Sequence, residues 1–259
     1  AAVAKKLGKE DDYETFNKRA GWWKHHYDAS TGFARGKDSK GNWREPFNPY
    51  QIVHMADDYC EGTAWQYTWL VPHDIEGLTE AMGGREVTIQ KLDRLFTEPS
   101  RIDGETVDMT GLVGQYVHGN EPSHHIIYFY SQLGEVNKAA DLSRRILAEF
   151  YAANPDGLCG NEDMGQMSAW YMLSSMGLYQ VNPFDGKYWF GSPLFDSVSI
   201  NLPSGKVFTI KAENNSAENK YIEKALLNGK PYDKNYIEYS DIVCGGELVF
   251  YMDNTSLND

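Results

Sequence analysis

The hydrophobic pattern of the chain changes its period near residue 180, and this change constrains the fold more than any other feature. Before that point apolar residues recur at steps of three and four, as Phe16, Ala20 and Trp23 do, which predicts amphipathic helices. After it, short segments rich in β-branched and aromatic residues alternate and are separated by turns. We therefore expect an α plus β chain: a helical domain over 1–179, and a small antiparallel, β-strand-rich region over 180–259 packed on it.

The same patterns predict the individual elements. Helices are expected at 10–28, 60–70, 84–97, 121–133, 136–152 and 164–177. Strands are expected at 195–202, 206–213, 220–232, 236–243 and 247–252, with a hairpin tip at Asn228-Gly229.

Two helical segments of the chain resemble each other, which indicates stacked helical hairpins. Residues 7–33 and 133–158 both run from Leu-Gly through an arginine-containing helix to a turn ending in glycine and an apolar residue. Such hairpins build either a solenoid or a closed α/α toroid. The long polar connections at 29–59 and 98–120 favour the toroid, because solenoid turns are short, and loops of this length commonly carry function.

The charge balance narrows the class of ligand. The formal net charge is −13, which disfavours nucleic acid and anionic membrane surfaces and suits a neutral ligand or a metal cation. Aromatic residues make up 14% of the chain, and sugar-binding proteins use aromatic faces as platforms. No apolar run approaches the roughly 18 residues that a membrane-spanning helix needs.

The cysteines and the first residues bear on the origin of the chain. Cys60, Cys159 and Cys244 form no CxxC pair, so we expect no zinc site or disulfide framework. Three free, buried thiols are favoured over the alternative of a single bridge. The opening AAVAKKLGKEDDYETF has no signal-peptide pattern and looks like the interior of a helix. We therefore expect that an N-terminal portion precedes this chain.

A carboxylate among aromatic residues marks the stretch YCEGTAWQYTWLVPHD at 59–74. Burial of Glu61 beside apolar rings would disfavour its ionised form and raise its pKa, as a general acid at neutral pH requires. The alternative is a glutamate that complements the positive end of a helix. His73 and Asp74 would either orient a substrate hydroxyl or serve as an N-cap.

The loop NWREPFNPY at 42–50 is stiffened by its prolines and carries Trp43, Arg44 and Glu45 on its outside. Two interpretations remain open. The loop either contacts a ligand, or it is an ordinary connection anchored by Trp43 and Phe47.

Hard oxygen ligands occur in the stretch QYVHGNEPSHHIIYFY at 115–130. Asn120 and Glu121 lie in a turn before Pro122, which suits the first position of a helix, and with neighbouring carbonyls they could hold Ca²⁺. The stretch also holds three histidines: His118, His124 and His125. Their spacing does not match a zinc pair on one helix face, so an N-capped helix with core histidines is the alternative.

Two adjacent acids precede an apolar helix in GNEDMGQMSAW at 160–170. Asn161 would cap a helix that begins near Asp163, and Glu162 and Asp163 would complement its positive end. A carboxylate held ionised in this way is also a good base for activating water. Carboxylates in three loops, aromatic platforms and a candidate calcium site together outline a glycosidase with two carboxylates flanking the scissile bond.

These stretches resemble glycoside hydrolase family 92, the bacterial calcium-dependent exo-α-mannosidases. The resemblance runs in order over nearly the whole chain. It is carried by GNWREPFNP, YCEGTAWQYTWLVPHD, GQYVHGNEPSHHIIYFY, GNEDMGQMSAWYMLSSMGLYQVNP, FGSPLFDSVSINLPSGKVFTI and GGELVFYM.

The resemblance implies part of an (α/α)6 barrel, preceded in family members by an N-terminal β-sandwich domain. It also implies single-step inverting hydrolysis of terminal α-linked mannose, by default α-1,2, from mannosides or N-glycans, with Ca²⁺ at the mannose O2 and O3. A periplasmic, surface-attached or secreted location in a bacterium follows from the same likeness. Without the sandwich domain, the chain alone would be inactive or poorly closed.

Matched position by position, the resemblance implies Glu61 as general acid and Asp163 as general base, with Glu162 as the alternate base. Asn120 and Glu121 match the metal stretch. Further substrate contacts are expected at Trp43, Gln66, His73, Asp74, His118, His124 and Asn161. Two other functions remain open: a carbohydrate-binding or scaffold fragment without catalysis, and another α/α-toroid glycosidase.

Overall fold

The computed structural model describes residues 1–105 and 109–255. The contacts divide the chain into two compact units, residues 1–117 and residues 118–259. The boundary expected at residue 179 falls inside the second unit, because helices of the expected helical domain pack there against strands. The connection expected at 98–120 includes residues 106–108, which lie outside the described residues.

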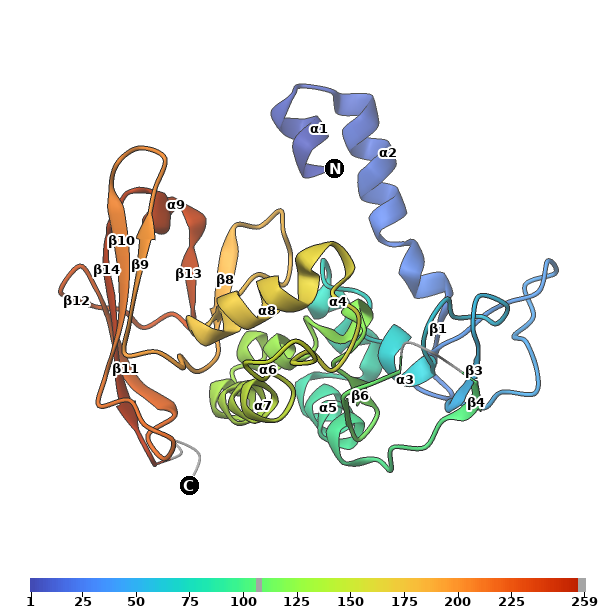
Figure 1. The fold of residues 1–259 in the computed structure, drawn as a ribbon. Helices are drawn as coiled ribbons and strands as arrows, with labels where there is room; N and C mark the ends of the chain where they lie inside the picture. The colour runs from blue at the N-terminus through green and yellow to red at the C-terminus, as the bar shows by residue number, and fades with distance from the viewer. Residues whose placement is uncertain (106–108, 256–259) are drawn as a thin grey trace. The chain divides into compact units, whose positions relative to one another are not determined.

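The first unit is built from short helices and two-stranded ladders (Figure 1). Its helices are α1 (Ala2–Lys6), α2 (Glu10–Ala20), the 3-10 helix η1 (Trp22–His25), α3 (Ala64–Tyr67), α4 (Ile75–Met82) and α5 (Arg85–Thr97). Its ladders are β1 (Tyr27–Asp28) with β2 (Phe33–Ala34), β3 (Gln51–Val53) with β4 (Asp103–Glu105), and β5 (Leu112–Val113) with β6 (Tyr116–Val117).

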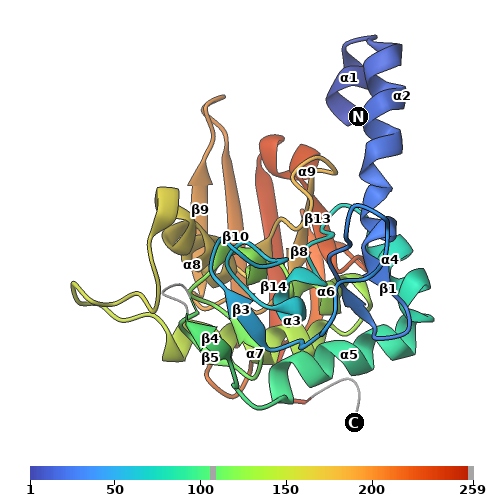
Figure 2. The same cartoon turned by 90° about the vertical axis from the view of Figure 1, so that its right-hand side faces the viewer.

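Helices of the first unit pair as hairpins. Helix α1 lies beside α2 in two perpendicular views (Figure 2), and α4 packs on α5. Gly83 ends α4 in the left-handed conformation that a side chain would strain, which makes the tight turn into α5. Helix α4 was not expected from the sequence, although Asp74 at its N-cap and Gly83 at its C-cap are its local signals.

Two expected helices of this unit are shorter than their apolar periodicity predicts. Helix α2 ends at Ala20 rather than near residue 28, and none of its side chains is buried. The helix expected over 60–70 is only the four residues of α3, because the capping box of Thr63 and Gln66 starts it late.

Over its described residues, 118–255, the second unit combines four α-helices and two 3-10 helices with two sheets. Its helices are η2 (Glu121–Ser123), α6 (Ile127–Gln132), α7 (Val136–Glu149), η3 (Asp163–Gly165), α8 (Gln166–Ser175) and α9 (Tyr239–Val243). Its strands are β7 (Leu178–Tyr179), β8 (Lys187–Phe190), β9 (Ser197–Asn201), β10 (Val207–Glu213), β11 (Tyr221–Leu227), β12 (Lys230–Pro231), β13 (Tyr236–Glu238) and β14 (Gly246–Asp253).

The larger sheet has the order β12-β11-β14-β10-β9, and the smaller one has the order β13-β8-β7. The expectation of a purely antiparallel unit is wrong, because β10 and β14 pair in parallel from Phe208 opposite Gly246 to Glu213 opposite Tyr251. The chain between them contains β11, β12, β13 and α9, which is long enough for the crossover that parallel strands need.

The residues between the remaining strands explain where those strands begin and end. Asn228 and Gly229 both have positive φ and join β11 to β12 as the expected hairpin tip. The strand expected over 236–243 ends at Glu238, where α9 begins. The sequence has no apolar alternation through 239–243, so the helix takes over there.

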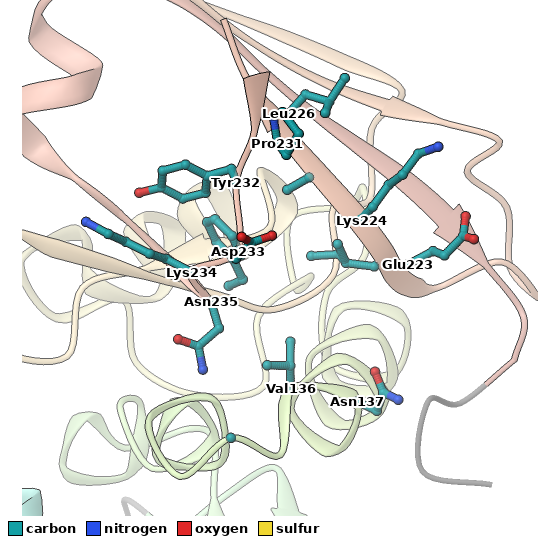
Figure 3. A pocket seen from close by; sticks show the side chains of 14 residues that line it. Val136, Asn137, Glu223, Lys224, Leu226, Pro231, Tyr232, Asp233, Lys234 and Asn235 are labelled. Carbon is teal, nitrogen blue, oxygen red and sulfur yellow. The ribbon is translucent and has the colours of Figure 1, made fainter. Parts of the chain in front are cut away.

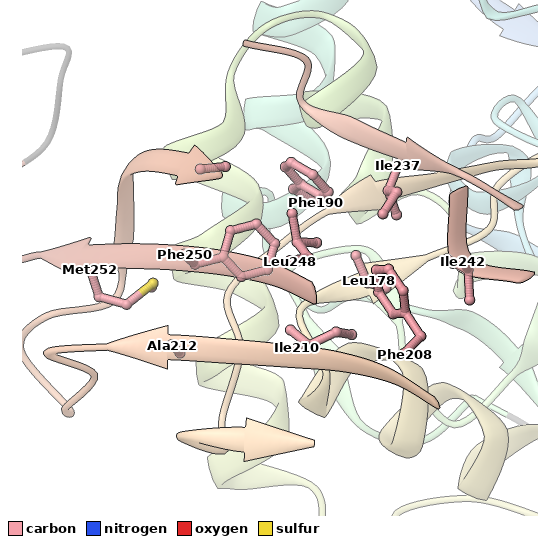
Figure 4. Packing of buried hydrophobic residues seen from close by; sticks show 11 residues of the cluster. Leu178, Phe190, Phe208, Ile210, Ala212, Ile237, Ile242, Leu248, Phe250 and Met252 are labelled. Atoms are coloured by element: carbon pink, nitrogen blue, oxygen red, sulfur yellow. The ribbon is translucent and has the colours of Figure 1, made fainter. Parts of the chain in front are cut away.

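A hydrophobic core binds the larger sheet to the smaller one (Figure 4). It joins Phe208, Leu248 and Phe250 of the larger sheet to Phe190 of β8 and Ile237 of β13. The rings of Phe190 and Phe250 meet edge to face with centroids 4.9 Å apart. This core fixes the part of the chain that follows the candidate site residues.

All three cysteines are free. The expectation that they are buried is wrong for Cys60 and Cys244, which are exposed, and Cys159 is only partly covered. Cys60 lies in the polar turn before α3 and Cys244 follows α9, both surface segments.

Candidate active site

Glu61 lies in a tight turn just before α3 in the first unit. It is half-buried, and its backbone N–H donates to the hydroxyl of Tyr67 at 3.1 Å. A side chain at Gly62 would come within 2.9 Å of the Tyr67 ring, so only glycine allows this approach. These contacts therefore fix the backbone of Glu61 just before the start of the helix.

Gln66 supports this turn from inside the unit. It is 2% exposed, and its Oε1 accepts from the backbone N–H of Thr63 at 2.7 Å and from the Thr63 hydroxyl at 2.9 Å. Its Nε2 donates to the carbonyl of Gln115. Because both ends of the amide are engaged, Gln66 would position Glu61 rather than contact a substrate directly.

His73 and Asp74 follow the capping interpretation. The Asp74 carboxylate accepts from the backbone N–H of Gly77 at 3.0 Å and from the Trp23 indole at 3.1 Å. The Nε2 of His73 lies 2.9 Å from the carbonyl of Ala20. Asp74 thus ties the start of α4 to η1, and His73 ties the turn before α4 to the last residue of α2.

The loop at 42–50 is anchored by cations on aromatic rings. The Nζ of Lys37 lies 4.0 Å from the ring centroid of Trp43, and the Arg35 guanidinium lies 4.3 Å from that of Phe47. Arg35 is itself buried and bridges Asp28 at 2.7 Å and Glu45 at 2.6 Å. One face of the Trp43 ring is therefore covered by Lys37, which leaves less of it to serve as a platform.

In the second unit, two glycines bring the two oxygen-rich loops together. A Cβ added to Gly160 would lie 2.5 Å from the Cα of Gly119, so the two backbones touch directly. Gly119 directly precedes Asn120 and Glu121. Gly160 directly precedes Asn161, Glu162 and Asp163. Stretches about forty residues apart in the sequence thus become neighbours.

Asn120 and Glu121 start the 3-10 helix η2, with Pro122 at an early position as expected. Asn120 is buried and Glu121 is half-buried. An amide oxygen and a carboxylate are hard donors of the kind that Ca²⁺ prefers. Across residues 1–105 and 109–255, no group of three or more His, Cys, Asp or Glu side chains is arranged to hold a metal.

The backbone at 163–165 adopts an uncommon conformation. Asp163, Met164 and Gly165 have φ of 20°, 58° and 81°, and the side chains of Asp163 and Met164 are exposed. Strained backbone of this kind occurs preferentially at functional sites. It turns the Asp163 carboxylate outward just before α8.

The helix after these acids begins later than expected. Helix α8 starts at Gln166 with Gly165 as its N-cap, so Asn161 is not the capping residue. Instead the Glu162 carboxylate accepts from the backbone N–H of Ser168 at 3.2 Å and from its hydroxyl at 3.1 Å. The Glu162 carboxylate is thus occupied at the helix start, whereas within the part of the chain that the structure describes the Asp163 carboxylate makes no hydrogen bond to that helix.

A hydrogen-bonded aromatic cluster lies beneath these loops. The Tyr151 hydroxyl donates its proton to the carbonyl of Met167 at 3.1 Å. Its oxygen is therefore the acceptor in the contact with His118, whose Nε2–H donates to it at 2.7 Å. The Nε2–H of His124 donates to the carbonyl of His118 at 2.8 Å, and its Nδ1 accepts from Gln166 at 3.2 Å. Both histidines are buried, as the core-histidine interpretation predicts.

Burial keeps these histidines neutral. It lowers the pKa of His124 to about 4, and burial together with the nearby His124 lowers the pKa of His118 well below its ordinary value. Trp170 of α8 covers His118 with ring centroids 4.3 Å apart and donates its indole N–H to the carbonyl of His124 at 3.0 Å. Neutral histidines here bind α8 to the 118–124 loop and would act as hydrogen-bonding supports rather than as cations.

Four residues that were not predicted from the sequence support this site. Tyr151, Gln166, Ser168 and Trp170 hold the histidines and Glu162 in place. Gln166 and Trp170 lie within the GNEDMGQMSAW stretch, so their proximity in sequence was a usable signal. Tyr151 had none, because its contact with His118 joins residues 33 positions apart.

Known glycosidases are similar to this chain over most of its length. The profile of the glycosyl hydrolase family 92 catalytic domain matches residues 1–254. A protein described as an uncharacterized secreted glycosidase of Arthroderma benhamiae is 29% identical over 269 residues, which cover 95% of this chain and 33% of that protein.

Two solved structures from Bacteroides thetaiotaomicron are similar over 98% of this chain. One is a family GH92 α-mannosidase in complex with mannoimidazole, with 42% identity, a TM-score of 0.90 and 34% of its own length covered. The other is a family GH92 inverting mannosidase, with 39% identity, a TM-score of 0.86 and 35% of its length covered. The chain thus spans about a third of the length of the relatives that it matches.

Proposed function

The chain belongs to glycosyl hydrolase family 92, and on this premise we propose that it is part of an enzyme that hydrolyses terminal, non-reducing α-linked mannose. The substrates are mannosides or N-glycans, with the α-1,2 linkage as the first to test. The match of the catalytic-domain profile over residues 1–254 is the observation that carries this proposal. The two mannosidase structures, at 42% and 39% identity, support the choice of sugar.

The proposed reaction is a single displacement with inversion at the anomeric carbon. Glu61 as a carboxylic acid gives its proton to the glycosidic oxygen as the bond to the sugar breaks. Asp163 takes a proton from the water that attacks the opposite face of the ring. Inversion by this route requires the two carboxyl groups to stand roughly 6.5–9.5 Å apart, leaving room for that water.

Asp163 is the better candidate for the base, and Glu162 is the alternate. The contacts of Glu162 with Ser168 would have to break before its carboxylate could take a proton from water. Asp163 is exposed on a strained backbone, so its carboxylate is open to an attacking water. Asn161 is exposed next to both acids and would position the attacking water or a sugar hydroxyl.

Asn120 and Glu121 are the proposed protein ligands for Ca²⁺. Their oxygen donors fit the ion in kind, and the rest of its roughly six to eight ligands would be carbonyls, waters and sugar hydroxyls. A bound Ca²⁺ would polarise the sugar hydroxyls and favour a distorted ring. Gly119 and Gly160 would keep these ligands beside the base-bearing loop, and His118 and His124 would support that loop from below.

This chain would be one part of a larger catalytic domain. Its helical hairpins would form part of an (α/α)6 toroid, and an N-terminal β-sandwich domain would complete the site. We infer a periplasmic, surface-attached or secreted protein of a bacterium. The secreted Arthroderma benhamiae relative supports export, and the two Bacteroides thetaiotaomicron structures support a bacterial source. If the chain alone binds mannosides without turnover, it acts as a carbohydrate-binding fragment of the longer protein.

Substitution of Glu61 tests the acid role. In the full-length protein, Glu61→Gln should reduce kcat by about 10²–10⁴-fold on α-1,2-mannobiose, the range of general acid catalysis. The loss should be much smaller on an aryl mannoside whose leaving group needs no proton. Asp163→Asn should slow both substrates alike, because water must be activated in either case.

Two controls accompany this measurement. Glu76→Gln changes an exposed acid in the first turn of α4, outside the proposed machinery, and should leave both rates unchanged. Proton NMR of the first-formed sugar reports its anomeric configuration. Equal losses on both substrates for Glu61→Gln would remove the acid assignment, and a retained α-anomer would remove the inverting mechanism.

A further inference from the structure

A cavity of about 450 Å³ lies in the second unit between β11, the segment 231–235 and the start of α7 (Figure 3). Its volume is within the roughly 300–1,000 Å³ of small-molecule sites. None of the residues proposed above for catalysis or calcium lines it. Its chemistry therefore has to be explained separately.

The inner wall of the cavity is apolar. Val136 at the start of α7, Phe190 of β8 and Ile222 of β11 line it, together with Tyr232. The rings of Phe190 and Tyr232 lie 6.4 Å apart between centroids, and Figure 3 shows Val136 directed toward the middle of the lining residues. Such a wall can cover the C–H face of a ligand ring but cannot satisfy a charge.

Two carboxylates are available at this cavity. Asp233 extends between the 231–235 segment and β11 (Figure 3), and Glu223 lies on β11 at a β-bulge, where the alternation of side chains is broken. Among residues 1–105 and 109–255, neither carboxylate has an ion pair or hydrogen bond. Both therefore keep their full capacity to accept hydrogen bonds from a ligand.

The two lysines of the cavity have other contacts. The Nζ of Lys234 lies 2.9 Å from Glu238, and that of Lys224 lies 4.3 Å from the ring centroid of Tyr251. Neither Glu238 nor Tyr251 lines the cavity. Two acids and two lysines balance in charge, so the lining favours a neutral ligand over an ion.

Side-chain amides complete the lining. Asn137 is buried near the start of α7, and Asn235 donates its Nδ2–H to the carbonyl of Ser131 at 2.5 Å, which fixes its orientation. Amides offer donors and acceptors together, whereas the carboxylates only accept. The ligand that matches both, and the apolar wall, is a neutral ring that bears several hydroxyls.

We propose that this cavity is a second carbohydrate-binding site that holds one neutral sugar residue of an oligosaccharide. The Asp233 carboxylate accepts from adjacent hydroxyls, and the amides of Asn137 and Asn235 complete the polar contacts. The wall of Val136, Phe190 and Tyr232 packs on the apolar face of the sugar. The site goes beyond the proposed hydrolysis, and only the choice of a mannoside as first probe rests on that proposal.

Chemical-shift mapping on the whole chain tests the site. The Glu61→Gln variant prevents turnover, and α-1,2-mannobiose, maltose and cellobiose are titrated separately to millimolar concentrations. At least one should shift the backbone amide resonances of 222–226 and 232–235 with a saturable curve. Asp233→Ala should raise the Kd at this site about tenfold, because a charged acceptor is removed.

Matched variants make the result decisive. Lys230→Ala removes an exposed lysine of β12 that does not line the cavity and should leave the Kd unchanged, whereas Glu223→Gln provides a second test of the acceptors should Asp233→Ala fail to fold. The proposal is overturned if no disaccharide shifts these resonances, or if the Asp233 and Lys230 variants bind equally well. Shifts with maltose or cellobiose but not mannobiose would support the site while counting against mannose. Absence of shifts beside intact hydrolysis by the unmutated protein would overturn the site alone.

Discussion

A close backbone approach between Gly119 and Gly160 brings the two oxygen-rich loops of the second unit side by side. It adds to the hydrogen bonds by which Gln166 and Trp170 of α8 bind His124. Gly160 is not among the glycines with positive φ, so its requirement comes from space and not from backbone strain. Any side chain at position 160 would therefore collide with the backbone of Gly119.

Replacement of Gly160 by alanine should push the two loops apart. The added methyl group meets backbone, which cannot rotate away, so we expect the free energy of unfolding to fall by about 1–3 kcal/mol, as for other overpacked sites. Urea unfolding of the variant measures this change. Gly21→Ala is the matched control, since a Cβ there meets only the Lys18 carbonyl at 3.6 Å and φ is −87°. Equal stability of the two variants would contradict the contact.

Single residues were predictable from the sequence where their role is local. Of the two alternatives for Asp74, the N-cap is the one that the structure shows, because a cap depends on neighbours within three positions. Pro122, expected at the first position of a helix, is the second residue of η2. The hydrogen bonds from Ser168 to Glu162 were not predicted, because the helix starts two residues later than its apolar pattern suggests. The approach of Gly160 to Gly119 leaves no pattern in one sequence at all.

Buried imidazoles hold helix α8 to the 118–124 loop. The stability of the protein should therefore depend on pH through these histidines. The folded protein keeps His124 neutral down to a pKa of about 4, whereas its ordinary value is 6.5. Between these values the unfolded chain binds a proton that the folded chain does not. Stability should therefore fall as the pH falls from 6.5 toward 4, and it should be fully present above that range.

The loss from His124 alone should be on the order of 3 kcal/mol, from 1.36 kcal/mol for each pKa unit. Chemical unfolding at a series of pH values measures the slope. His124→Gln keeps a donor and an acceptor but cannot titrate, so it should flatten the slope between pH 4 and 6.5. His73→Gln, at an exposed residue of the first unit, is the control. An unchanged slope in the His124 variant would contradict this account.

Elements were predictable where one local period runs without interruption. Helices α5 and α7 and strands β10 and β14 lie where the sequence places them, because each presents one apolar face to a core. Helix α4 was missed because it is short and follows a proline-containing turn. The parallel pairing of β10 with β14 follows from the order of the strands in the sheet. The alternation of apolar and polar residues within a strand carries no information about that order.

At the scale of the whole molecule, the acidic balance of the chain suits a cation, but it cannot say where the cation binds. The chain carries 37 acidic and 24 basic residues, so weak calcium binding at many surface positions is expected alongside any specific site. A specific site has to be distinguished by its dependence on particular residues. Asn120 and Glu121, beside Gly119, are the pair to which the proposal assigns it.

A bound ion stabilises the folded state by mass action, by about 2.7 kcal/mol at a concentration 100 times its Kd. Adding Ca²⁺ should therefore raise the melting temperature of the unmutated chain, and a chelator should reverse the change. Glu121→Gln should remove most of this shift because it removes a charged ligand. Glu149→Gln should keep it, because Glu149 is an exposed acid of α7 paired with Arg145.

Mg²⁺ separates specific binding from general screening of the acidic surface. It demands a smaller octahedral shell, so a site completed by carbonyls and waters around Asn120 and Glu121 should respond to Ca²⁺ at lower concentration than to Mg²⁺. Equal shifts with both ions, or an equal response of the Glu121 and Glu149 variants, would mean that calcium acts on the surface as a whole. In that case the 120–121 turn would serve only to start η2, and the catalytic proposal would have to stand without the metal.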